Sequence, residues 1–478
     1  MLRKLLLFLI GIVAVSSLAS CMVDDSYSSE TNVGLAFSED TVSLDTIFTS
    51  TPSTTKSMWV YNRSKENLRF DIELVGGNQQ GFRINANGRF LSPLIGSRLH
   101  DVELKRNDSL RIYVEVTPEN VSSALETSLT DLLTFGFSNG FKQSVVLRAH
   151  VLKAIVIQSL SLDRDTVLAG DVPYLIKESI VVHKDRTLTL DAGTKFYFES
   201  GACLKVDGRL ICKGTPDRLV VFRGSRFDKI AEGIPYDRIS GQWQGIRFGE
   251  LSYENMLEYV DIHSAHDALY CDSAQDNNRR RLSLRQCQVY NNDGYGLFAS
   301  NSNIDMENCI FANSAKSCME FHGGTISLNG VTATQFYPFS GGQGKALLLS
   351  NGSSLDFQAS NSIITGYGNS EIDFNKTNKP YSFNYNFRNS LIRLAKPSEP
   401  ADLQHFQEVV FEDADDSIGV GIKQFDGINT ELFFYRFNLN KQSKAIGVAD
   451  PLSAPQVDVY GRKRRVHPAA GAVEFFDN

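Results

Sequence analysis

The stretch "QCQVYNN" occupies residues 286–292, and "NCIFANS" occupies residues 308–314. The second stretch repeats the residue types of the first one 22 residues later, and "GVTATQF", which begins at Gly330, repeats them more loosely. A period of about 20 to 50 residues is typical of proteins built from stacked structural repeats. The spacing therefore predicts a repeat architecture.

Aligning these segments gives four columns of residues that are almost entirely apolar. The columns are Cys287, Cys309, Val331 and Ser362; Val289, Phe311, Ala333 and Ile364; Leu282, Ile304, Ile326 and Phe357; and Leu284, Met306, Leu328 and Ala359. Only Ser362 is polar. Apolar positions lie two apart within each segment, which is the spacing of a strand with one buried face. Between segments the spacing is three, as expected where the chain turns a corner.

We therefore predict an all-β chain in which each unit is one coil of a right-handed parallel β-helix, with about three short strands per coil. Coils stack at about 4.8 Å, and each strand pairs with its equivalent in the next coil. The alternative is a β-sandwich with accidental similarity. We assign residues 155–478 to the β-helix and a C-terminal cap. The predicted cap protects the last sheet edge and includes Asp450, Asp458, Gly461 and Glu474.

The N-terminus has the composition of an export signal. Residues 1–20 combine a basic start, an apolar run and small residues before Cys21. The sequence "LASC" resembles the bacterial lipoprotein box, which implies lipidation of Cys21 and a membrane partner through that lipid. The alternative is an ordinary secretory signal. The acidic, polar tether at 21–32 resembles the signal for surface lipoproteins of Bacteroidetes-type bacteria, so we expect a lipid-anchored outer-membrane protein exposed at the cell surface.

Composition limits the classes of partner. The 478-residue chain has a formal net charge of −7, and loss of Arg3 and Lys4 with the leader makes it −9. An acidic chain of this kind is not expected to bind nucleic acid. Six cysteines remain after Cys21; we expect Cys287 and Cys309 to be stacked core positions. Their spacing matches no zinc motif.

Residues 33–154 have a different pattern, in which predicted strands with alternating apolar and polar residues are separated by Asn, Gly and Pro. Their length suits an antiparallel β-sandwich. The phrase "DTVSLDTIFTSTPSTTKSMWVYNRS" resembles the immunoglobulin-like modules that precede β-helices in Bacteroidetes lipoproteins. The coils that begin at "GQWQGIRF" (241–248) resemble the pectin-lyase-like β-helix proteins. Together they resemble a lipoprotein family of unknown function, in which the sandwich is expected to be a spacer.

A catalytic groove on a β-helix requires acids that converge from adjacent coils. Extending the alignment one coil earlier places Asp261 and His263 on the outer face, but the same positions in the next coils are Gln288 and Tyr290, then apolar residues and threonines. The β-helix also contains no Gly-His-Gly of the polygalacturonase type. The remaining polar cluster is "DIHSAHD", with Asp261, His263, His266 and Asp267 as candidates for an acid/base pair or a divalent metal. The alternative is a strand and turn that face water.

Three aromatic clusters are candidate sugar-binding platforms, since exposed rings stack on sugar faces. They are "FYPF" (336–339), "YSFNYNF" (381–387) and "FFYRF" (433–437), and the residues proposed to contact a ligand are Phe336, Tyr337, Phe339, Tyr381 and Tyr385. The alternative is aromatic packing inside the coils. The basic turn "RRRLSLR" (279–285) could hold sulfate or carboxylate groups, although most such runs are solvated.

The sequence favours a non-catalytic surface lipoprotein that binds a polysaccharide, host glycan or other surface polymer. The first alternative is a polysaccharide lyase or glycoside hydrolase acting on another face. The second is a structural envelope or adhesion component. No cofactor or metal site is predicted, and a divalent cation such as calcium is left open.

Overall fold

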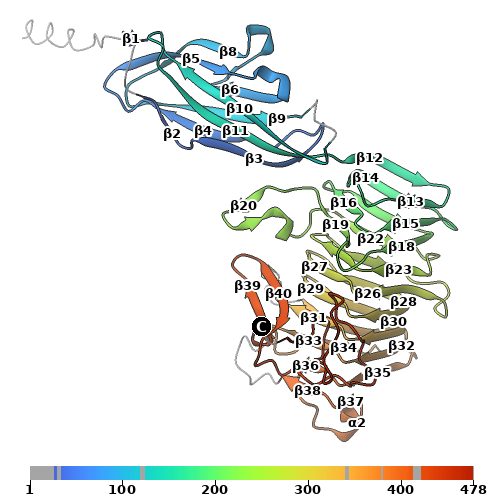
Figure 1. Ribbon diagram of the computed structural model, residues 1–478. Helices are drawn as coiled ribbons and strands as arrows, with labels where there is room; N and C mark the ends of the chain where they lie inside the picture. The colour runs from blue at the N-terminus through green and yellow to red at the C-terminus, as the bar shows by residue number, and fades with distance from the viewer. Residues whose placement is uncertain are drawn as a thin grey trace, which may run out of the picture. The chain divides into compact units, whose positions relative to one another are not determined.

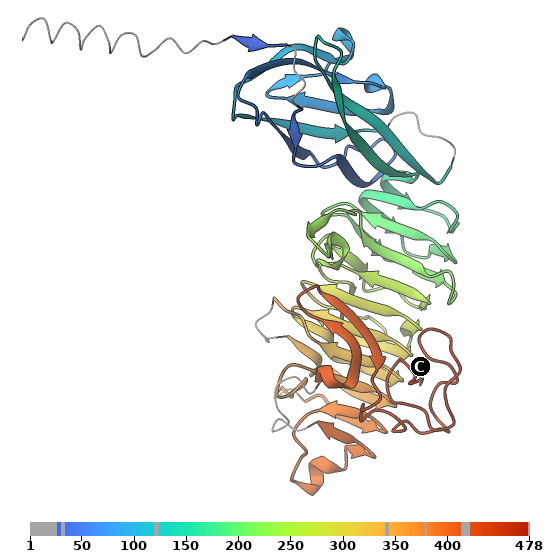
Figure 2. The same cartoon turned by 60° about the vertical axis from the view of Figure 1, so that its left-hand side comes forward.

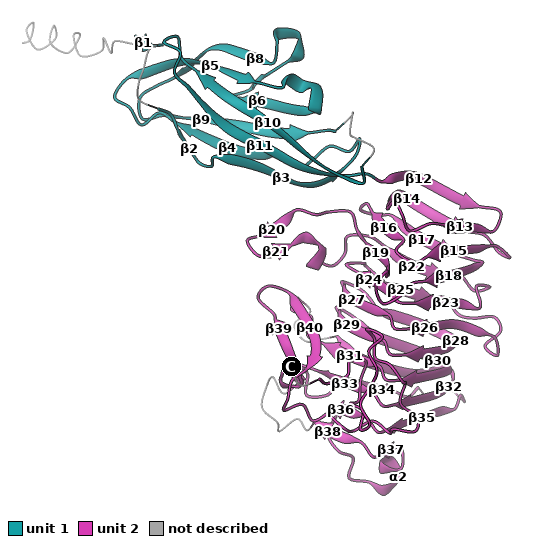
Figure 3. Ribbon diagram, in the orientation of Figure 1, with its two compact units in different colours: residues 1–153 teal, residues 154–478 magenta. Residues whose placement is uncertain are grey.

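The computed structural model describes residues 26–29, 34–118, 124–339, 344–377, 380–412 and 421–476 (Figure 1). Cys21 and the predicted signal lie outside this part. The chain forms two compact units, residues 1–153 and 154–478 (Figure 3). Strands dominate both units, and within the described residues no helix has the length and apolar character needed to cross a membrane.

Unit 1 is a sandwich of two sheets around one core. The six-stranded sheet contains β1 (Tyr27–Ser28), β3 (Thr41–Phe48), β5 (Asn67–Leu74), β8 (Arg98–Leu104), β10 (Glu126–Gly136) and β11 (Lys142–Leu152). The five-stranded sheet contains β2 (Ala36–Phe37), β4 (Lys56–Tyr61), β6 (Phe82–Ala86), β7 (Arg89–Phe90) and β9 (Ser109–Val116). Two short 3₁₀ turns, η2 (Gly77–Gln80) and η3 (Pro93–Ile95), connect them. The inward positions alternate along β4, β5, β6 and β9, as expected for a sheet with one buried face, and the alternation is interrupted in β3 and β8, where the strand register shifts.

The sandwich is antiparallel except at two edges. Strand β1 pairs in parallel with β5, and β3 pairs in parallel with β11. A β-bulge at Ala149 and His150 interrupts the second pairing. The sequence predicted antiparallel pairing throughout, because alternation within a strand carries no information about the direction of its neighbour.

Unit 2 is a parallel β-helix whose strands form three ladders, each running from coil to coil (Figure 1). The first ladder is β12 (Ile155–Leu162), β14 (Tyr174–Val182), β17 (Cys203–Val206), β22 (Gly245–Phe248), β25 (Leu269–Cys271), β28 (Leu297–Glu307), β30 (Ser317–Asn329), β32 (Lys345–Ser360) and β34 (Ile372–Asn375). The second is β13 (Thr166–Leu168), β15 (Thr187–Asp191), β18 (Arg209–Lys213), β23 (Asn255–Glu258), β26 (Arg280–Arg285), the distal parts of β28, β30 and β32, β35 (Phe383–Arg388) and β37 (Phe406–Gln407).

The third ladder carries the candidate site on its outer face. It contains the start of β14, then β16 (Lys195–Phe198), β19 (Val220–Gly224), β24 (Val260–His263), β27 (Gln288–Asn292), β29 (Ile310–Ser314), β31 (Thr332–Gln335), β33 (Ile363–Gly366), β36 (Leu391–Arg393) and β38 (Val410–Glu412). The elements outside the ladders are β20 (Lys229–Ala231), β21 (Ile234–Pro235), η4 (Tyr236–Arg238), α2 (Pro400–Leu403), η5 (Gly421–Gln424), β39 (Phe425–Asn429) and β40 (Phe434–Leu439).

Strand pairing confirms three of the four predicted columns residue by residue. Val289 pairs with Phe311, which pairs with Ala333, and the same holds for the two columns that begin at Leu282 and Leu284. All of these side chains are buried in one continuous core. The extension to the preceding coil is also confirmed, because Ile262 pairs with Val289.

The predicted corners are positions of left-handed backbone. The residue before each inward anchor has a positive φ, and these residues are Tyr259, Gln286, Asn308, Gly330, Asn361 and Asn389. Asn and Gly tolerate this conformation better than other residues, because a short polar side chain bonds locally and glycine has no Cβ. Successive inward positions are therefore three apart in sequence at a corner, whereas they are two apart within a strand.

The C-terminal segment, residues 421–476, does not form the predicted cap over the last sheet edge. It lies against the outer face of the third ladder, where the β39–β40 hairpin crosses the coils (Figures 1 and 2). The outward residues Ile310, Ile363 and Leu391 pack beneath it and are almost completely buried. Because these outward positions are apolar, the coil face needs a cover, and the C-terminal segment provides it.

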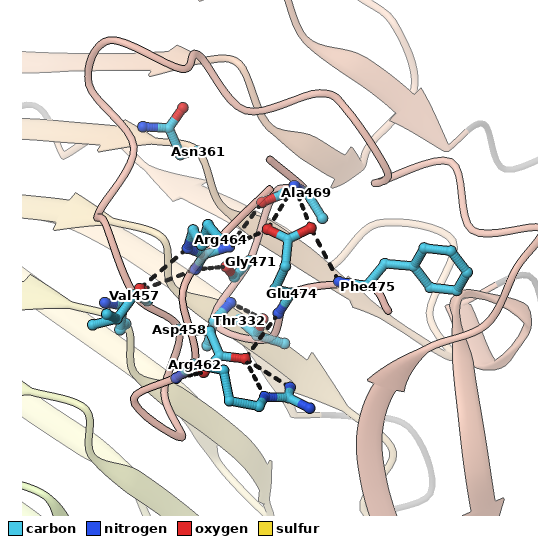
Figure 4. Close-up of polar contacts among 12 residues, drawn as sticks. Thr332, Asn361, Val457, Asp458, Arg462, Arg464, Ala469, Gly471, Glu474 and Phe475 are labelled. Atoms are coloured by element: carbon cyan, nitrogen blue, oxygen red, sulfur yellow. Dashed lines mark hydrogen bonds and ion pairs between the residues drawn. The ribbon is translucent and has the colours of Figure 1, made fainter. Parts of the chain in front are cut away.

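A buried polar network fixes this segment to the coils (Figure 4). The guanidinium of Arg464 donates to Asn308 Oδ1 at 2.8 Å and lies 3.5 Å from the Glu474 carboxylate. Burial lowers the pKa of Arg464 and raises the pKa of Glu474. Thr332 Oγ1 accepts from Ala472 N at 2.8 Å. Glu474, which the sequence assigned to an end cap, therefore anchors a lateral cover.

Candidate functional site

A cavity of about 350 Å³ opens on the third ladder of unit 2. Its floor is the outer face of β24, β27 and β29, and its walls are the 229–238 loop and the β39–β40 hairpin. The lining residues are Pro235, Asp237, Arg238, His263, Gln288, Tyr290, Asn291, Ile310, Phe433, Phe434, Tyr435, Arg436, Phe437 and Tyr460. Segments almost 200 residues apart in sequence thus meet at one site.

An insertion between β19 and β22 builds one wall. Arg223, on β19, forms an ion pair with Asp237 at 3.1 Å, and the Arg223 side chain is largely buried. Gln242 Nε2 donates to the carbonyls of Tyr236 and Ile239 at 2.6 and 2.8 Å. These bonds hold η4 against the coil, so that Asp237 faces the cavity from a fixed position.

The floor contains a hydrogen-bonded group of three side chains. His263 Nδ1 lies 2.6 Å from Asp261 Oδ1, and Tyr290 Oη donates to Asp261 Oδ2 at 3.3 Å. The rings of His263 and Tyr290 stack with centroids 4.9 Å apart and an interplanar angle of 14°. Burial, followed by the Asp261 and Asp237 charges, raises the pKa of Tyr290 well above its usual range. Tyr290 is therefore a neutral hydrogen-bond donor.

This arrangement leaves one nitrogen of His263 available. Because Nδ1 is hydrogen-bonded to the Asp261 carboxylate, Nε2 is the ring nitrogen that remains for a ligand. No described residue forms a hydrogen bond with Nε2, and the His263 ring lines the cavity. The group can accept a hydrogen bond from a hydroxyl, or accept a proton.

Phe433 and Phe434 line the cavity, and two further rings that do not line it, Phe339 and Tyr337, continue outward from Phe433. Phe339, which is 59% exposed, packs against Phe433 with centroids 5.0 Å apart, and Tyr337 packs against Phe339 at 5.6 Å. Tyr337 Oη bonds Ser240 Oγ at 2.7 Å, which joins the rim to the insertion. We call Tyr337, Phe339, Phe433 and Phe434 the aromatic rim.

Two arginines flank the rim. The guanidinium carbons of Arg238 and Arg436 lie 5.1 and 5.3 Å from the centroid of the Phe434 ring. Arg238 Nη1 also donates to Leu432 O at 2.9 Å and so ties the insertion to the hairpin. With Asp237 and His263, the cavity therefore carries two guanidiniums, one carboxyl group and one imidazole besides its tyrosines.

The predicted cluster "DIHSAHD" does not form one site. Asp261 and His263 belong to the cavity floor, whereas His266 lies beyond the corner and pairs with Asp293 at 2.6 Å. Asp267 Oδ1 accepts from the backbone of Tyr295. The corner after His263 separates the two halves, and among the described residues no group of three or more His, Cys, Asp or Glu could hold a metal ion.

The aromatic candidates also divide. Tyr337 and Phe339 belong to the rim, but Phe336 is fully buried against Tyr367 and Phe425. Tyr385 occupies an inward position, where it pairs with Phe357 and stacks on His405 with centroids 4.3 Å apart. Phe336 is therefore not accessible to a ligand, whereas Tyr385 is half-buried and packs against the core.

Tyr381 is 44% exposed and does not line the cavity. The basic turn is largely neutralised. Arg281 is fully buried and donates to four backbone carbonyls, and Arg285 pairs with Asp305 and Glu307 at 2.7 and 2.6 Å. An anion site in this turn is therefore not supported.

Sequence reasoning missed Asp237, Arg238 and Tyr460. Asp237 and Arg238 lie in an insertion that has no counterpart in the next coils, and Tyr460 lies in the lateral cover. One signal was available, since residues 225–244 interrupt the regular succession of coils. Long loops on regular scaffolds frequently carry function.

No known protein-family profile matches the sequence, and no curated protein matches it. Among solved structures, a family 28 exopolygalacturonase of Yersinia enterocolitica aligns with 76% of this chain and 80% of its own length, at 12% sequence identity and a TM-score of 0.24. The assignment of the β-helix rests on the strand pairing described above.

Proposed function

We propose that the protein is a surface lipoprotein whose β-helix unit binds a glycan or another surface polymer at the cavity, without catalysis. The observation that carries this proposal is the aromatic rim above a polar floor. Apolar ring faces bind the C–H faces of sugars, while a few fixed polar groups select hydroxyl positions. Phe339 offers the exposed ring, and Asp237, His263 and Gln288 offer the polar groups.

The size of the cavity supports a short ligand segment. Small-molecule sites have volumes of about 300–1,000 Å³, so a cavity of about 350 Å³ is at the lower end of that range. The insertion and the hairpin stand on two sides of the floor. We infer that one or two sugar units enter the cavity and that the rest of the polymer lies outside it.

A glycan array with purified residues 22–478 tests this function. We expect Phe339→Ala to weaken retention of the bound glycan about tenfold, since loss of one stacking ring removes about 1 kcal/mol or more. Tyr381→Ala is the matched control, because Tyr381 is an exposed ring away from the cavity. Equal losses in both variants, or no retained glycan on the array, would contradict the cavity as the site.

A second candidate function is hydrolysis or lyase cleavage of a polysaccharide. The pairing of Asp261 with His263, beside Asp237 in the same cavity, favours it, because a positioned histidine is a common general acid or base. Assays for new reducing ends and for unsaturated products on the array-positive polymers distinguish the two functions. Product formation that is lost in His263→Gln, while binding is kept, would establish the enzyme. Binding without product supports recognition alone.

The proposal includes the cellular location of the protein, which is the outer membrane. The basic and apolar residues 1–20 before Cys21 support lipidation and an outer-membrane anchor. We also propose that the sandwich is immunoglobulin-like, in keeping with the resemblance to Bacteroidetes lipoproteins. Expression of the full chain in a Bacteroidetes host, with and without Cys21→Ala, tests the anchor. The unaltered chain should partition with membranes and be cleaved by protease added to intact cells, and the variant should not.

A further inference from the structure

The five-stranded sheet of unit 1 has an outer face rich in arginine and aromatic residues. Its exposed or half-exposed side chains are Trp59 and Tyr61 from β4, Arg111 and Tyr113 from β9, Arg83 and Asn85 from β6, Phe90 from β7, and Arg63 just after β4. Trp59, Phe90 and Tyr113 are each 38% exposed. We call these eight residues the arginine–aromatic face.

Strand register places these residues in adjacent rows. Trp59 lies directly opposite Arg111, and Tyr113 lies opposite Asn85, which in turn lies opposite Phe90. The rows span four neighbouring strands. The face is therefore one continuous surface and not a set of scattered exposed rings.

Every arginine of this face rests on a ring. The Arg111 guanidinium carbon lies 5.3 Å from the Trp59 ring centroid and 5.0 Å from that of Tyr113. Arg83 lies 5.7 Å from Phe90, and Arg63 lies 5.5 Å from Tyr61. Stacking orients the planar guanidinium, and its edge can still present N–H groups to a carboxylate.

These arginines have no acidic partner among the described residues. Arg111 Nη2 donates to Ser57 Oγ at 3.0 Å, and no ion pair involves Arg63, Arg83 or Arg111 within the described chain. Glu115, the acid on this face, bonds Thr55. The face therefore carries three positive charges and the one negative charge of Glu115, which lies opposite Arg83 in the strand register without forming an ion pair, on a chain whose net charge is −7.

The opposite sheet shows that this is not a general property of the sandwich. Three ion pairs cross β5 and β8 on its outer face, Arg69–Glu103 at 2.7 Å, His100–Asp71 at 2.8 Å and Arg98–Glu73, whereas the exposed Lys142 and Arg148 of β11 form none with a described residue. Ion pairs therefore neutralise the β5–β8 part of one face, whereas no arginine of the arginine–aromatic face has an ion pair within the described residues. An external partner of complementary charge accounts for this difference.

We propose that the arginine–aromatic face docks an acidic segment of a partner protein. Trp, Tyr and Arg are the residues most enriched in protein–protein binding hot spots. Guanidiniums already cover a face of each exposed ring, which disfavours sugar stacking there. Oriented arginine forks bind carboxylates of Asp and Glu in a bidentate manner. This inference concerns unit 1 and is independent of the glycan function of unit 2.

Calorimetric titration of residues 22–478 with poly-L-glutamate tests the proposal. We expect binding that weakens about tenfold or more in Arg111→Gln and in Arg83→Gln, and that weakens further as salt increases. Arg98→Gln is the matched control, since it removes the same charge from the paired face. The urea transition of unit 1 and the far-ultraviolet circular dichroism should be unchanged in all three variants, which shows that each one is folded.

Trp59 reports the location of binding. The chain has two tryptophans, and Trp243 is fully buried, so iodide quenching of the native protein monitors Trp59. Poly-L-glutamate should protect Trp59 from iodide. No binding, equal loss in Arg98→Gln and Arg111→Gln, or unprotected Trp59 would overturn the proposal. Binding of polygalacturonate in place of poly-L-glutamate, with the same dependence on Arg111, would overturn the protein partner and identify an acidic glycan.

Discussion

Cys287, Cys309 and Ser362 occupy one inward column, and each side chain donates to a backbone carbonyl two residues earlier. The distances from Sγ or Oγ to the acceptor are 3.2 Å for Cys287, 3.3 Å for Cys309 and 2.7 Å for Ser362. From the sequence we predicted that these cysteines are small apolar core residues, but each thiol is also a weak hydrogen-bond donor. All six described cysteines are free thiols.

Ser362 provides a test of this role. Its Oγ also accepts from Val331 N at 3.1 Å, so Ser362→Ala leaves a buried N–H without a partner. We expect the free energy of unfolding of unit 2 to fall by about 1–3 kcal/mol. Ser362→Cys, which imitates the earlier coils, should lose less. Urea denaturation followed by Trp243 fluorescence measures both, and equal stability of Ser362→Ala and the unaltered chain would contradict the prediction.

Glu371 makes the stability of unit 2 depend on pH. Its buried carboxyl accepts from Gly368 N and Ala346 N, and burial raises its pKa from 4.5 to about 7. The folded state therefore keeps a proton that the unfolded state releases above pH 4.5. The contribution of Glu371 to the free energy of unfolding is therefore fully present below pH 4.5 and is lost as the pH rises through 7. The shift corresponds to about 3 kcal/mol.

Substitution of Glu371 by glutamine imitates the protonated acid. Unit 2 should lose stability between pH 5 and pH 8. We expect this loss to be smaller by about 3 kcal/mol in Glu371→Gln. Glu232→Gln is the control, because Glu232 is exposed in the insertion. The measurement is urea denaturation at both pH values. A Glu371→Gln variant with the same pH dependence as Glu232→Gln would show that Glu371 does not titrate in this range.

At the scale of elements, the lateral cover depends on one close approach to the coils. Gly471 has φ of +91°, and a Cβ at this position would lie 2.6 Å from Thr332 Oγ1 and from Ile363 Cδ1. Gly447, in the same segment, has φ of +74° and nothing within 4 Å of its Cβ position. The two glycines have similar backbones but different surroundings.

This pair separates backbone strain from steric overlap. We expect Gly447→Ala to cost about 1–2 kcal/mol, from its left-handed backbone alone. Gly471→Ala should cost roughly 1–3 kcal/mol more and should release residues 421–476 from the coils. Limited proteolysis, with hydrogen exchange of the β39–β40 hairpin, measures that release. Equal protection in the two variants would mean that the close approach does not hold the segment.

The coil columns were predictable because each depends on local periodicity. Val289 and Phe311 keep the same phase after 22 residues, so the sequence alone aligns them. The lateral cover was not predictable in this way, since residues 421–476 lack the period. A signal for it was present at Ile310 and Ala312, which are apolar at outward positions and indicate a covered face.

The candidate site was predictable only in part. Asp261 and His263 follow from the alignment, because outward neighbours alternate with inward residues on one strand. Asp237 comes from an insertion and Phe434 from a hairpin nearly 200 residues later, and no local pattern brings them together. Aromatic clusters alone did not distinguish packing from exposure, as Phe336 and Phe339 show.

At the scale of the whole molecule, each unit has its own hydrophobic core and its own tryptophan. Trp59 belongs to the sandwich, whereas Trp243 stacks on Phe198 in the β-helix with centroids 4.3 Å apart and donates to His263 O at 2.9 Å. The exposed Trp59 should emit at longer wavelength than the buried Trp243. The two units can therefore be monitored separately in one chain.

Phe311→Ala tests whether the units are energetically separate. Removal of a fully buried ring from a coil should cost about 3–5 kcal/mol, and in a stacked repeat the loss is confined to coils that share its contacts. In the Trp59→Phe background, which leaves Trp243 as the reporter, Phe311→Ala should shift the urea transition to lower urea concentration.

The matched change in unit 1 is Phe135→Ala, also at a fully buried ring. It should instead shift the transition reported by iodide access to Trp59 and leave the Trp243 transition within about 0.5 kcal/mol, as expected for sites without shared contacts. If either substitution shifted both transitions equally, the two cores would unfold as one cooperative unit.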